Sequence, residues 1–161
     1  MTSSVFGIDL LPHQPPMRLV EEVVHIVPGV SASARRVTRP EDWYFQGHFP
    51  EDPVVPAIVL IELLAQTGGL AAASAGDSDS ASGGQLRVAA IGPFKFPSGA
   101  RPHQRLDARA TVIARMGGII KIEGDVLADG VRVAVGSVVL AQVPARSPSK
   151  LQEAPEDGIV K

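Results

Sequence analysis

The chain of 161 residues contains no cysteine, which excludes a disulfide framework, a thiol nucleophile and a cysteine-ligated zinc site. Its 15 lysines and arginines form no run, so we expect no surface that binds a nucleic-acid backbone. No segment approaches the roughly 18 consecutive apolar residues of a membrane-spanning helix, and the first residues lack a secretory leader pattern. We therefore expect a cytoplasmic protein that binds no nucleic acid and does not insert into a membrane.

Aromatic residues are also scarce, at 4% of the chain, yet more than half of them lie within the short segment WYFQGHF, residues 43–49. The rest of the composition is ordinary for a globular protein, with 45% hydrophobic and 20% charged residues. A chain of this length buries enough apolar surface to fold without disulfides or metals. We expect a single domain over residues 1–143, followed by a disordered tail over residues 144–161.

The order of apolar, polar and turn-forming segments predicts an α+β domain. An almost entirely apolar helix should begin just after Pro56, because proline is tolerated in the first helical turn, and other structure must wrap around such a helix. The pairs Asp129-Gly130 and Pro28-Gly29 predict turns between neighbouring strands. Several strands around one buried helix indicate an antiparallel sheet. We expect strands at residues 17–25, 31–38, 86–96, 106–116, 119–127 and 131–143, with loops at 39–56 and 76–85.

A carboxyl group inside an apolar helix needs a partner or a function, because loss of water raises the free energy of its charged form. Glu62 is such a group, and Gln66 lies four residues later on the same helical face, where its amide can orient the carboxyl group. In this setting Glu62 suits a general acid. The alternative is that Glu62 pairs with an arginine or faces a subunit interface.

His48 lies in the aromatic segment, where an apolar pocket would favour the neutral imidazole and let it act as a base. The alternative is a loop histidine with one backbone hydrogen bond. His13, His25 and His103 show no ligand spacing, so we expect no metal site. The free N–H groups at the start of the helix, near Ala57, could hold an oxyanion. A base, an acid and an oxyanion site together suit removal of a proton next to a carbonyl group.

At this point the segment GHFPEDPVVPAIVLIELLAQTGG resembles the signature of the 3-hydroxyacyl-acyl-carrier-protein dehydratases of fatty acid synthesis. The likeness includes Gly-His-Phe-Pro, two later prolines, a carboxylate fourteen residues after the histidine, and Ala-Gln shortly after that. The segment LLPHQPPMRLVEEV is similar to the family's opening segment and first strand, and GIIKIEGDVLADGVRVAVGSVVLA to its closing hairpin. The resemblance covers about residues 10 to 142.

The resemblance implies a hot-dog fold, in which a curved antiparallel β-sheet wraps a long central helix. Two such units join edge to edge as a homodimer in this family, often with three dimers in a hexamer. The family's catalytic histidine falls on His48 and its carboxylate on Glu62, and the two meet across the dimer interface. The substrate arrives on the phosphopantetheine arm of an acyl carrier protein, and no other cofactor is implied. His48 would remove the C2 proton and Glu62 would protonate the departing hydroxyl group.

Further residues take supporting roles in this hypothesis. Gln66 would orient Glu62, and the N–H of Ala57 would hold the thioester oxygen, although the family usually has glycine there and the extra methyl group crowds the thioester. The aromatic residues expected to line the substrate tunnel are Phe45, Phe49, Phe94 and Phe96. A basic rim that steers an acidic carrier protein would consist of Arg87, Lys95, Arg101 and Arg105.

Two other functions fit the same fold. A hot-dog thioesterase would hydrolyse the acyl thioester by activating water, but the spacing from His48 to Glu62 argues against it. A non-catalytic acyl-binding homologue would keep the fold without the activity, and Ala57 is the residue that favours this alternative. The pathway could be primary fatty acid synthesis or the synthesis of a related polyene or polyketide chain.

Overall fold

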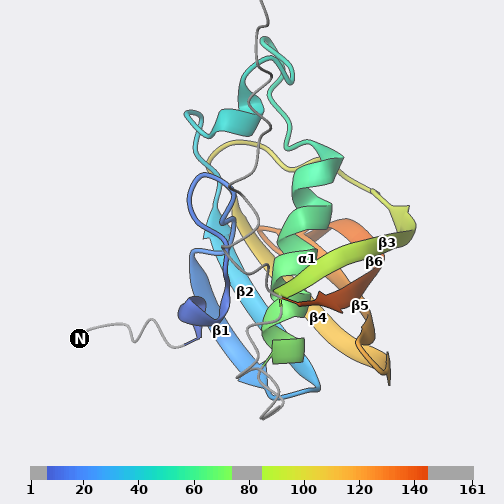
Figure 1. The fold of residues 1–161 in the computed structure, drawn as a ribbon. Coiled ribbons are helices and arrows are strands. Elements are labelled where there is room, and N and C mark those ends of the chain that lie inside the picture. Colours follow the sequence, from blue (N-terminus) through green and yellow to red (C-terminus); the bar gives the residue numbers. More distant parts are fainter. Residues whose placement is uncertain (1–6, 74–84, 145–161) are drawn as a thin grey trace, which may run out of the picture.

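The computed structural model describes residues 7–73 and 85–144, which form one long helix, six strands and two short 3-10 helices (Figure 1). The loop predicted from residue 76 lies mostly outside this range, as does the tail predicted beyond Pro144. The elements are η1 (Ile8–Leu10), β1 (Glu22–Val27), β2 (Ser31–Val37), η2 (Trp43–Phe45), α1 (Ala57–Ala73), β3 (Gln85–Lys95), β4 (Arg105–Met116), β5 (Ile119–Ala128) and β6 (Val131–Val143).

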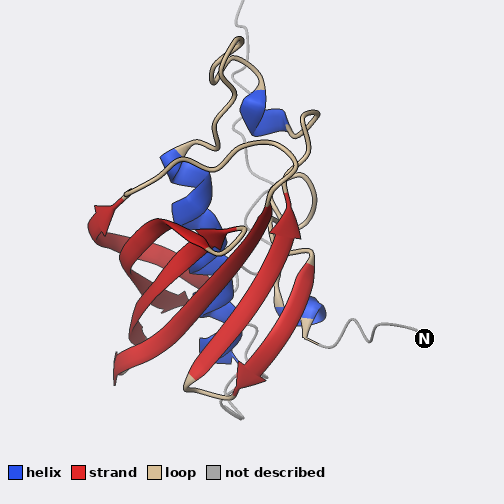
Figure 2. Cartoon of the chain, turned by 180° about the vertical axis from the view of Figure 1, so that it is seen from behind, coloured by secondary structure: helices blue, strands red, loops and turns tan. Residues whose placement is uncertain are grey.

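All strands belong to one antiparallel sheet, in the order β1-β2-β4-β5-β6-β3. The sheet curves around α1, so that the helix occupies its concave side (Figures 1 and 2). After α1 the chain reaches the far edge of the sheet, which leaves β3 as one edge strand and β1 as the other. This is the hot-dog arrangement, and it confirms the predicted α+β fold class.

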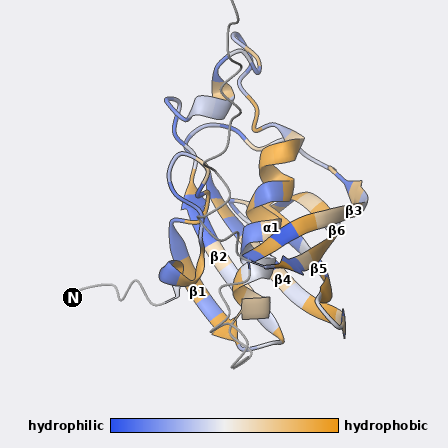
Figure 3. Cartoon of the chain, viewed as in Figure 1, coloured by the Kyte–Doolittle hydropathy of each residue, from blue (hydrophilic) through white to orange (hydrophobic). Residues whose placement is uncertain are grey.

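The helix packs its leucine-rich face against the sheet. Leu63, Leu64 and Leu70 are fully buried, and Figure 3 shows hydrophobic residues recurring along α1 and along the strands. A Cβ atom added at Gly68 would lie 2.9 Å from the side chain of Ile122, so this glycine lets β5 approach the helix closely.

The prediction that other structure surrounds the helix on all sides is wrong for one stripe. Ile58 is 71% exposed, and the side chain of Glu62 retains 28% of its exposure. The physical reason is that the sheet is open, because its edge strands β1 and β3 do not pair with each other. One face of α1 near its beginning is therefore uncovered in the protomer.

The turns match the sequence patterns, whereas the first strand is displaced. Asp129 and Gly130 both have positive φ, of 46° and 86°, as a tight hairpin with right-handed strand twist requires. The strand predicted from residue 17 begins only at Glu22. The residues before it run across the helix, because the N–H of Leu19 is bound by a helical side chain and not by a neighbouring strand.

Among the described residues, no helix combines the length and apolar character needed to cross a bilayer, and α1 has 17 residues with a carboxyl group among them.

Candidate active site

The expected pair of polar side chains on α1 is present. Gln66 donates a hydrogen bond from Nε2 to Oε1 of Glu62 over 2.9 Å, as their spacing of one helical turn allows. The alternatives to a general acid were pairing of Glu62 with an arginine or a place at a subunit interface. No arginine pairs with Glu62 among the described residues. The exposed stripe on which it lies leaves the subunit-interface alternative open.

Gln66 also holds the segment that precedes β1 against the helix. Its Oε1 accepts a hydrogen bond from the N–H of Leu19 over 2.9 Å, and its Nε2 donates to the carbonyl oxygen of Met17 over 2.8 Å. Because Gln66 is 1% exposed, these backbone groups would have no water to replace it. The two contacts fix which end of the amide faces Glu62, so the donor nitrogen is committed to the carboxyl group.

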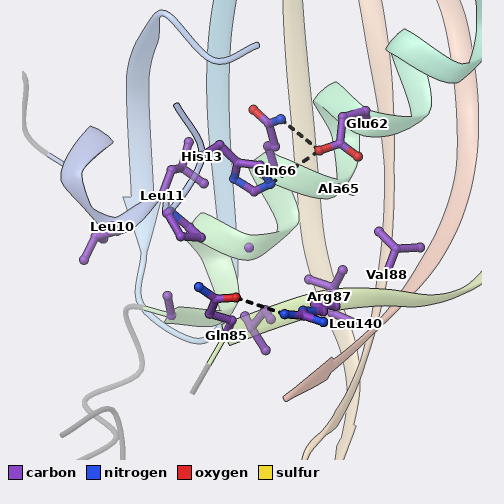
Figure 4. A pocket seen from close by; sticks show the side chains of 14 residues that line it. Leu10, Leu11, His13, Glu62, Ala65, Gln66, Gln85, Arg87, Val88 and Leu140 are labelled. Carbon is purple, nitrogen blue, oxygen red and sulfur yellow. Dashed lines mark hydrogen bonds and ion pairs between the residues drawn. The ribbon is translucent and has the colours of Figure 1, made fainter. Parts of the chain in front are cut away.

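His13 is a site residue that the sequence analysis did not identify. Its Nε2 lies 3.5 Å from Oε1 of Glu62, and the segment that carries it follows η1 (Figure 4). The sequence feature that could have identified His13 was the Leu-Pro-His segment, which was used only as part of the family resemblance.

No metal site was expected, because the histidines lack ligand spacing. Within residues 7–73 and 85–144, no three side chains that could bind a metal lie close together.

These side chains border a pocket of 390 Å³ that lies between η1, α1 and β3 (Figure 4). Most of its wall is apolar, with His13, Glu62 and Gln66 among its polar groups. A pocket of this size and lining suits a small-molecule ligand, and it removes part of the Glu62 side chain, of which 28% stays exposed, from bulk water. The other lining residues are Leu10, Leu11, Pro12, Ala65, Gly69, Ala73, Gln85, Leu86, Arg87, Val88 and Leu140.

None of the four phenylalanines expected to line the tunnel borders this pocket. Phe45 is buried in the core, where its ring lies 4.8 Å from that of Tyr44. Phe94 and Phe96 stack on each other at 5.8 Å, and Phe94 also covers the backbone of Gly136. Phe49 is 54% exposed and stacks on His48, so within one protomer small and aliphatic residues line the cavity, and the tunnel role of the four phenylalanines stays a prediction for the assembled protein.

His48 lies outside the pocket that contains Glu62. Its Nδ1 is 3.0 Å from the carbonyl oxygen of Val54, and its ring stacks on that of Phe49 at 4.3 Å. Because a carbonyl oxygen only accepts, Nδ1 carries the hydrogen in this contact, and a neutral ring has its free electron pair on Nε2. This is the geometry of an oriented base, and equally of the loop histidine that was its alternative.

The loop that carries His48 is held by a buried group of charges. Asp42 accepts hydrogen bonds from Nη2 of Arg36, the hydroxyl of Tyr44 and the N–H of Arg39, at 2.9, 2.7 and 2.8 Å. Burial raises the pKa of Asp42, but these donors outweigh it and hold the pKa below its usual value. Burial and the adjacent Asp42 raise the pKa of Tyr44, so its hydroxyl remains a donor.

The start of α1 offers free donors where the sequence predicted them. The first backbone hydrogen bonds reach the carbonyl oxygen of Pro56 from Val59 and Leu60, at 3.0 and 3.4 Å. No acceptor for the N–H of Ala57 occurs in the described part of the chain, and Ala57 itself is exposed. The N–H is therefore accessible to a ligand oxygen.

The four predicted rim cations do not gather at one place in the protomer. Arg87 and Lys95 lie eight residues apart on β3, which corresponds to about 26 Å along a strand. Arg101 forms an ion pair with Asp52, and Arg105 donates to Asp107 over 2.8 Å. Arg87 and Lys95 have no carboxylate partner among the described residues and remain the candidates for steering a partner.

Comparison with known proteins gives consistent matches. The family model of the FabA-like domain matches residues 11–137. The 3-hydroxyacyl-[acyl-carrier-protein] dehydratase FabZ of Campylobacter hominis is 33% identical over 122 residues, which are 76% of this chain and 84% of that protein. The protein of the same name from Ruminiclostridium cellulolyticum is 33% identical over 138 residues, or 85% of this chain and 94% of that protein.

A solved structure supports the same fold. The dehydratase heterocomplex ApeI:P from Xenorhabdus doucetiae matches with a TM-score of 0.68 and 16% identity, over 83% of this chain and 88% of that chain. The family match spans most of the sequence and includes both His48 and Glu62. The chain therefore belongs to the FabA-like domain family.

Proposed function

We propose that this chain removes water from 3-hydroxyacyl thioesters to give trans-2-enoyl thioesters, in fatty acid synthesis or the synthesis of a related acyl chain. The observation that carries the proposal is Glu62, a carboxyl group held by Gln66 at a largely apolar pocket. Membership of the family and the dehydratase names of its relatives support the same reaction. The substrate is carried by an acyl carrier protein, as the names of those relatives state for their own substrates.

In the proposed mechanism His48 accepts the C2 proton on Nε2, while its Nδ1 stays bound to the carbonyl oxygen of Val54. The electron pair of the C2–H bond forms the C2=C3 double bond, and the C3–O bond breaks. Glu62 donates its proton to the departing hydroxyl group, which leaves as water. The N–H of Ala57 binds the thioester oxygen as negative charge develops on it. Return of one proton from His48 to Glu62 restores both groups.

The proposal requires a second copy of the chain, because His48 does not line the pocket of its own protomer. The edge strand β3 exposes apolar side chains, with Val88 41% and Ile91 57% exposed. An unpaired strand edge with such residues is a surface on which another strand adds. Two copies joined along β3 would bring the His48 loop of one protomer to the pocket of the other. The chain therefore pairs with a second copy of itself to form a homodimer, and three such dimers could form a hexamer.

The acyl chain is placed in the pocket beside α1. Glu62, Gly69 and Ala73 follow one another along the pocket wall, so the cavity extends over about 16 Å of helix from the carboxyl group. The small side chains on this face leave room for a hydrocarbon tail. Within one protomer, this part of the wall would contact the acyl tail.

The test uses two variants of the assembled protein. His48→Ala and Glu62→Gln should each lower the rate of enoyl thioester formation by about a hundredfold or more, because each removes a general acid or base. Absorbance of the conjugated product measures dehydration, and a thiol reagent measures hydrolysis in the same samples. Near-normal dehydration by either variant would refute the assignment. Release of thiol without enoyl product by the wild-type protein would identify a thioesterase instead.

A further inference from the structure

His13 contacts the carboxyl group of Glu62 from a segment outside the helix. Its Nε2 lies 3.5 Å from Oε1, and both side chains line the same pocket (Figure 4). The two residues are 49 positions apart, so the contact depends on the fold and not on local spacing. Gln66 secures the segment after His13 to the helix through Met17 and Leu19.

The two carboxyl oxygens of Glu62 have different surroundings. Oε1 accepts a hydrogen bond from Nε2 of Gln66 at 2.9 Å and lies 3.5 Å from Nε2 of His13, which is within ion-pair distance. No partner of Oε2 occurs within the described ranges of the chain. In a carboxylic acid the carbonyl oxygen is the better acceptor of N–H groups, and the other oxygen carries the proton. In the proposed reaction, the proton that Glu62 transfers would then be carried on Oε2.

The other ring nitrogen of His13, Nδ1, makes no hydrogen bond that would fix the ring in another way. Nδ1 is buried and has no hydrogen-bond partner in the part of the chain that the structure describes. Buried polar atoms without a partner are rare in native proteins, and a catalytic role is one of the explanations for them. The imidazole thus has one polar contact among these residues, and that contact is with Glu62.

We propose that His13 is a positioning residue for the general acid. Its Nε2–H holds Oε1 together with Gln66, which keeps the protonated Oε2 directed at the departing hydroxyl group. This inference rests on the proposed dehydration and specifies how the acid is aimed. Two donors from two separate chain segments prevent rotation of the carboxyl group, which one donor alone would permit.

The experiment compares His13→Leu with His13→Gln in the assembled enzyme. Leucine keeps the size and removes the donor, whereas glutamine supplies an N–H at similar reach. His13→Leu should lower kcat by about ten- to a hundredfold with little change in KM, as expected when a reacting group is misplaced. His13→Gln should restore most of kcat. His25→Leu, an exposed histidine on β1, is the matched control and should behave as wild type.

A double variant separates positioning from packing. In a Glu62→Gln background, His13→Leu should cause no further loss of kcat, because no acid remains to be aimed. An undiminished loss in that background would overturn the inference, as would wild-type kcat in His13→Leu or equal losses in the leucine and glutamine variants.

A readout without turnover distinguishes this inference from the proposed function. Long-range proton–nitrogen spectra of His13 should show hydrogen on Nε2, and Glu62→Ala should shift that resonance. An unchanged resonance would overturn the contact. Inactivity of the wild-type protein towards every 3-hydroxyacyl thioester would overturn the proposed function even if the resonance shifts as expected.

Discussion

Asp42 connects the buried side of the His48 loop to the rest of the protein. It binds Arg36, whose Nη1 donates in turn to the carbonyl oxygen of Leu19 over 3.1 Å. Arg36 is 6% exposed, so its charge has little access to water and depends on Asp42 at 2.9 Å and, less closely, on Glu21 at 3.7 Å. The network joins the loop of the proposed base to the segment that Gln66 attaches to α1.

Asp42→Asn should lower the free energy of unfolding by about 2 kcal/mol near neutral pH, because the buried charge of Arg36 loses its nearer carboxylate and keeps only Glu21 at 3.7 Å. The pKa of Asp42 lies below its usual value in the folded protein. Its contribution is therefore complete above the unfolded pKa of about 4 and decreases as the pH falls through the lower folded pKa. Denaturant titrations of both proteins at several pH values measure this difference.

The control for this change is Asp9→Asn, at an exposed position in η1. It should leave stability unchanged at each pH. A difference between wild type and Asp42→Asn that stays constant down to pH 2 would contradict the role assigned to the ionised carboxylate.

The sequence predicted part of the site because part of it is local. Glu62 and Gln66 are one helical turn apart, so their hydrogen bond follows from the helix itself. The contact of His13 with Glu62 joins segments 49 residues apart, and no local pattern reports such a distance. The phenylalanines do not line the pocket of the protomer, because clustering along the chain does not tell whether a ring faces the core, the surface or a cavity.

At the scale of elements, the two adjacent glycines of α1 have different surroundings. An added Cβ would lie 2.9 Å from Ile122 at Gly68 and would meet nothing within 4 Å at Gly69. Gly68→Ala should therefore lower the free energy of unfolding by about 1–3 kcal/mol through overpacking against β5. Gly69→Ala should raise it by up to about 1 kcal/mol, because alanine favours the helix. Thermal or denaturant unfolding measures both, and a destabilised Gly69→Ala would contradict the open space beside it.

A larger side chain at Gly69 should change which acyl chains react. Gly69 lines the pocket beyond Glu62, so the leucine of Gly69→Leu would occupy the space proposed for the distal part of the chain. The ratio kcat/KM should fall by about tenfold or more for long 3-hydroxyacyl thioesters and little for the shortest ones. A panel of graded chain length measures the change, with Gly69→Ala as the smaller control step. An equal loss at every length would place the chain elsewhere.

Most elements were predictable because their signals are local. The apolar run after Pro56 marks α1, and Asp129-Gly130 marks the turn between β5 and β6. The first strand was predicted five residues too early, since Met17 and Leu19 look like strand residues and instead bind Gln66 across the helix. In the residues before β1, hydrogen bonds to the helix therefore take the place of the strand pairing that the apolar pattern predicted.

At the scale of the whole molecule, the protomer presents an incomplete site. The pocket holds the proposed acid but not the proposed base, and the exposed Ile58 and Ile91 leave apolar surface uncovered on α1 and β3. The pairing of two chains could not be read from the sequence pattern, since the same residues would suit a protomer that holds both groups. That pairing entered only through the family resemblance.

Mixing two inactive variants tests whether the site is shared between protomers. In a mixed dimer of His48→Ala and Glu62→Gln chains, one site carries both substitutions and the other carries neither. Random pairing makes half of the dimers mixed, and each has one intact site of two, so about a quarter of wild-type activity should return. The subunits are exchanged by dilution and reconcentration, and enoyl formation is measured before and after. If both groups act within one protomer, every site keeps one defect and exchange restores nothing.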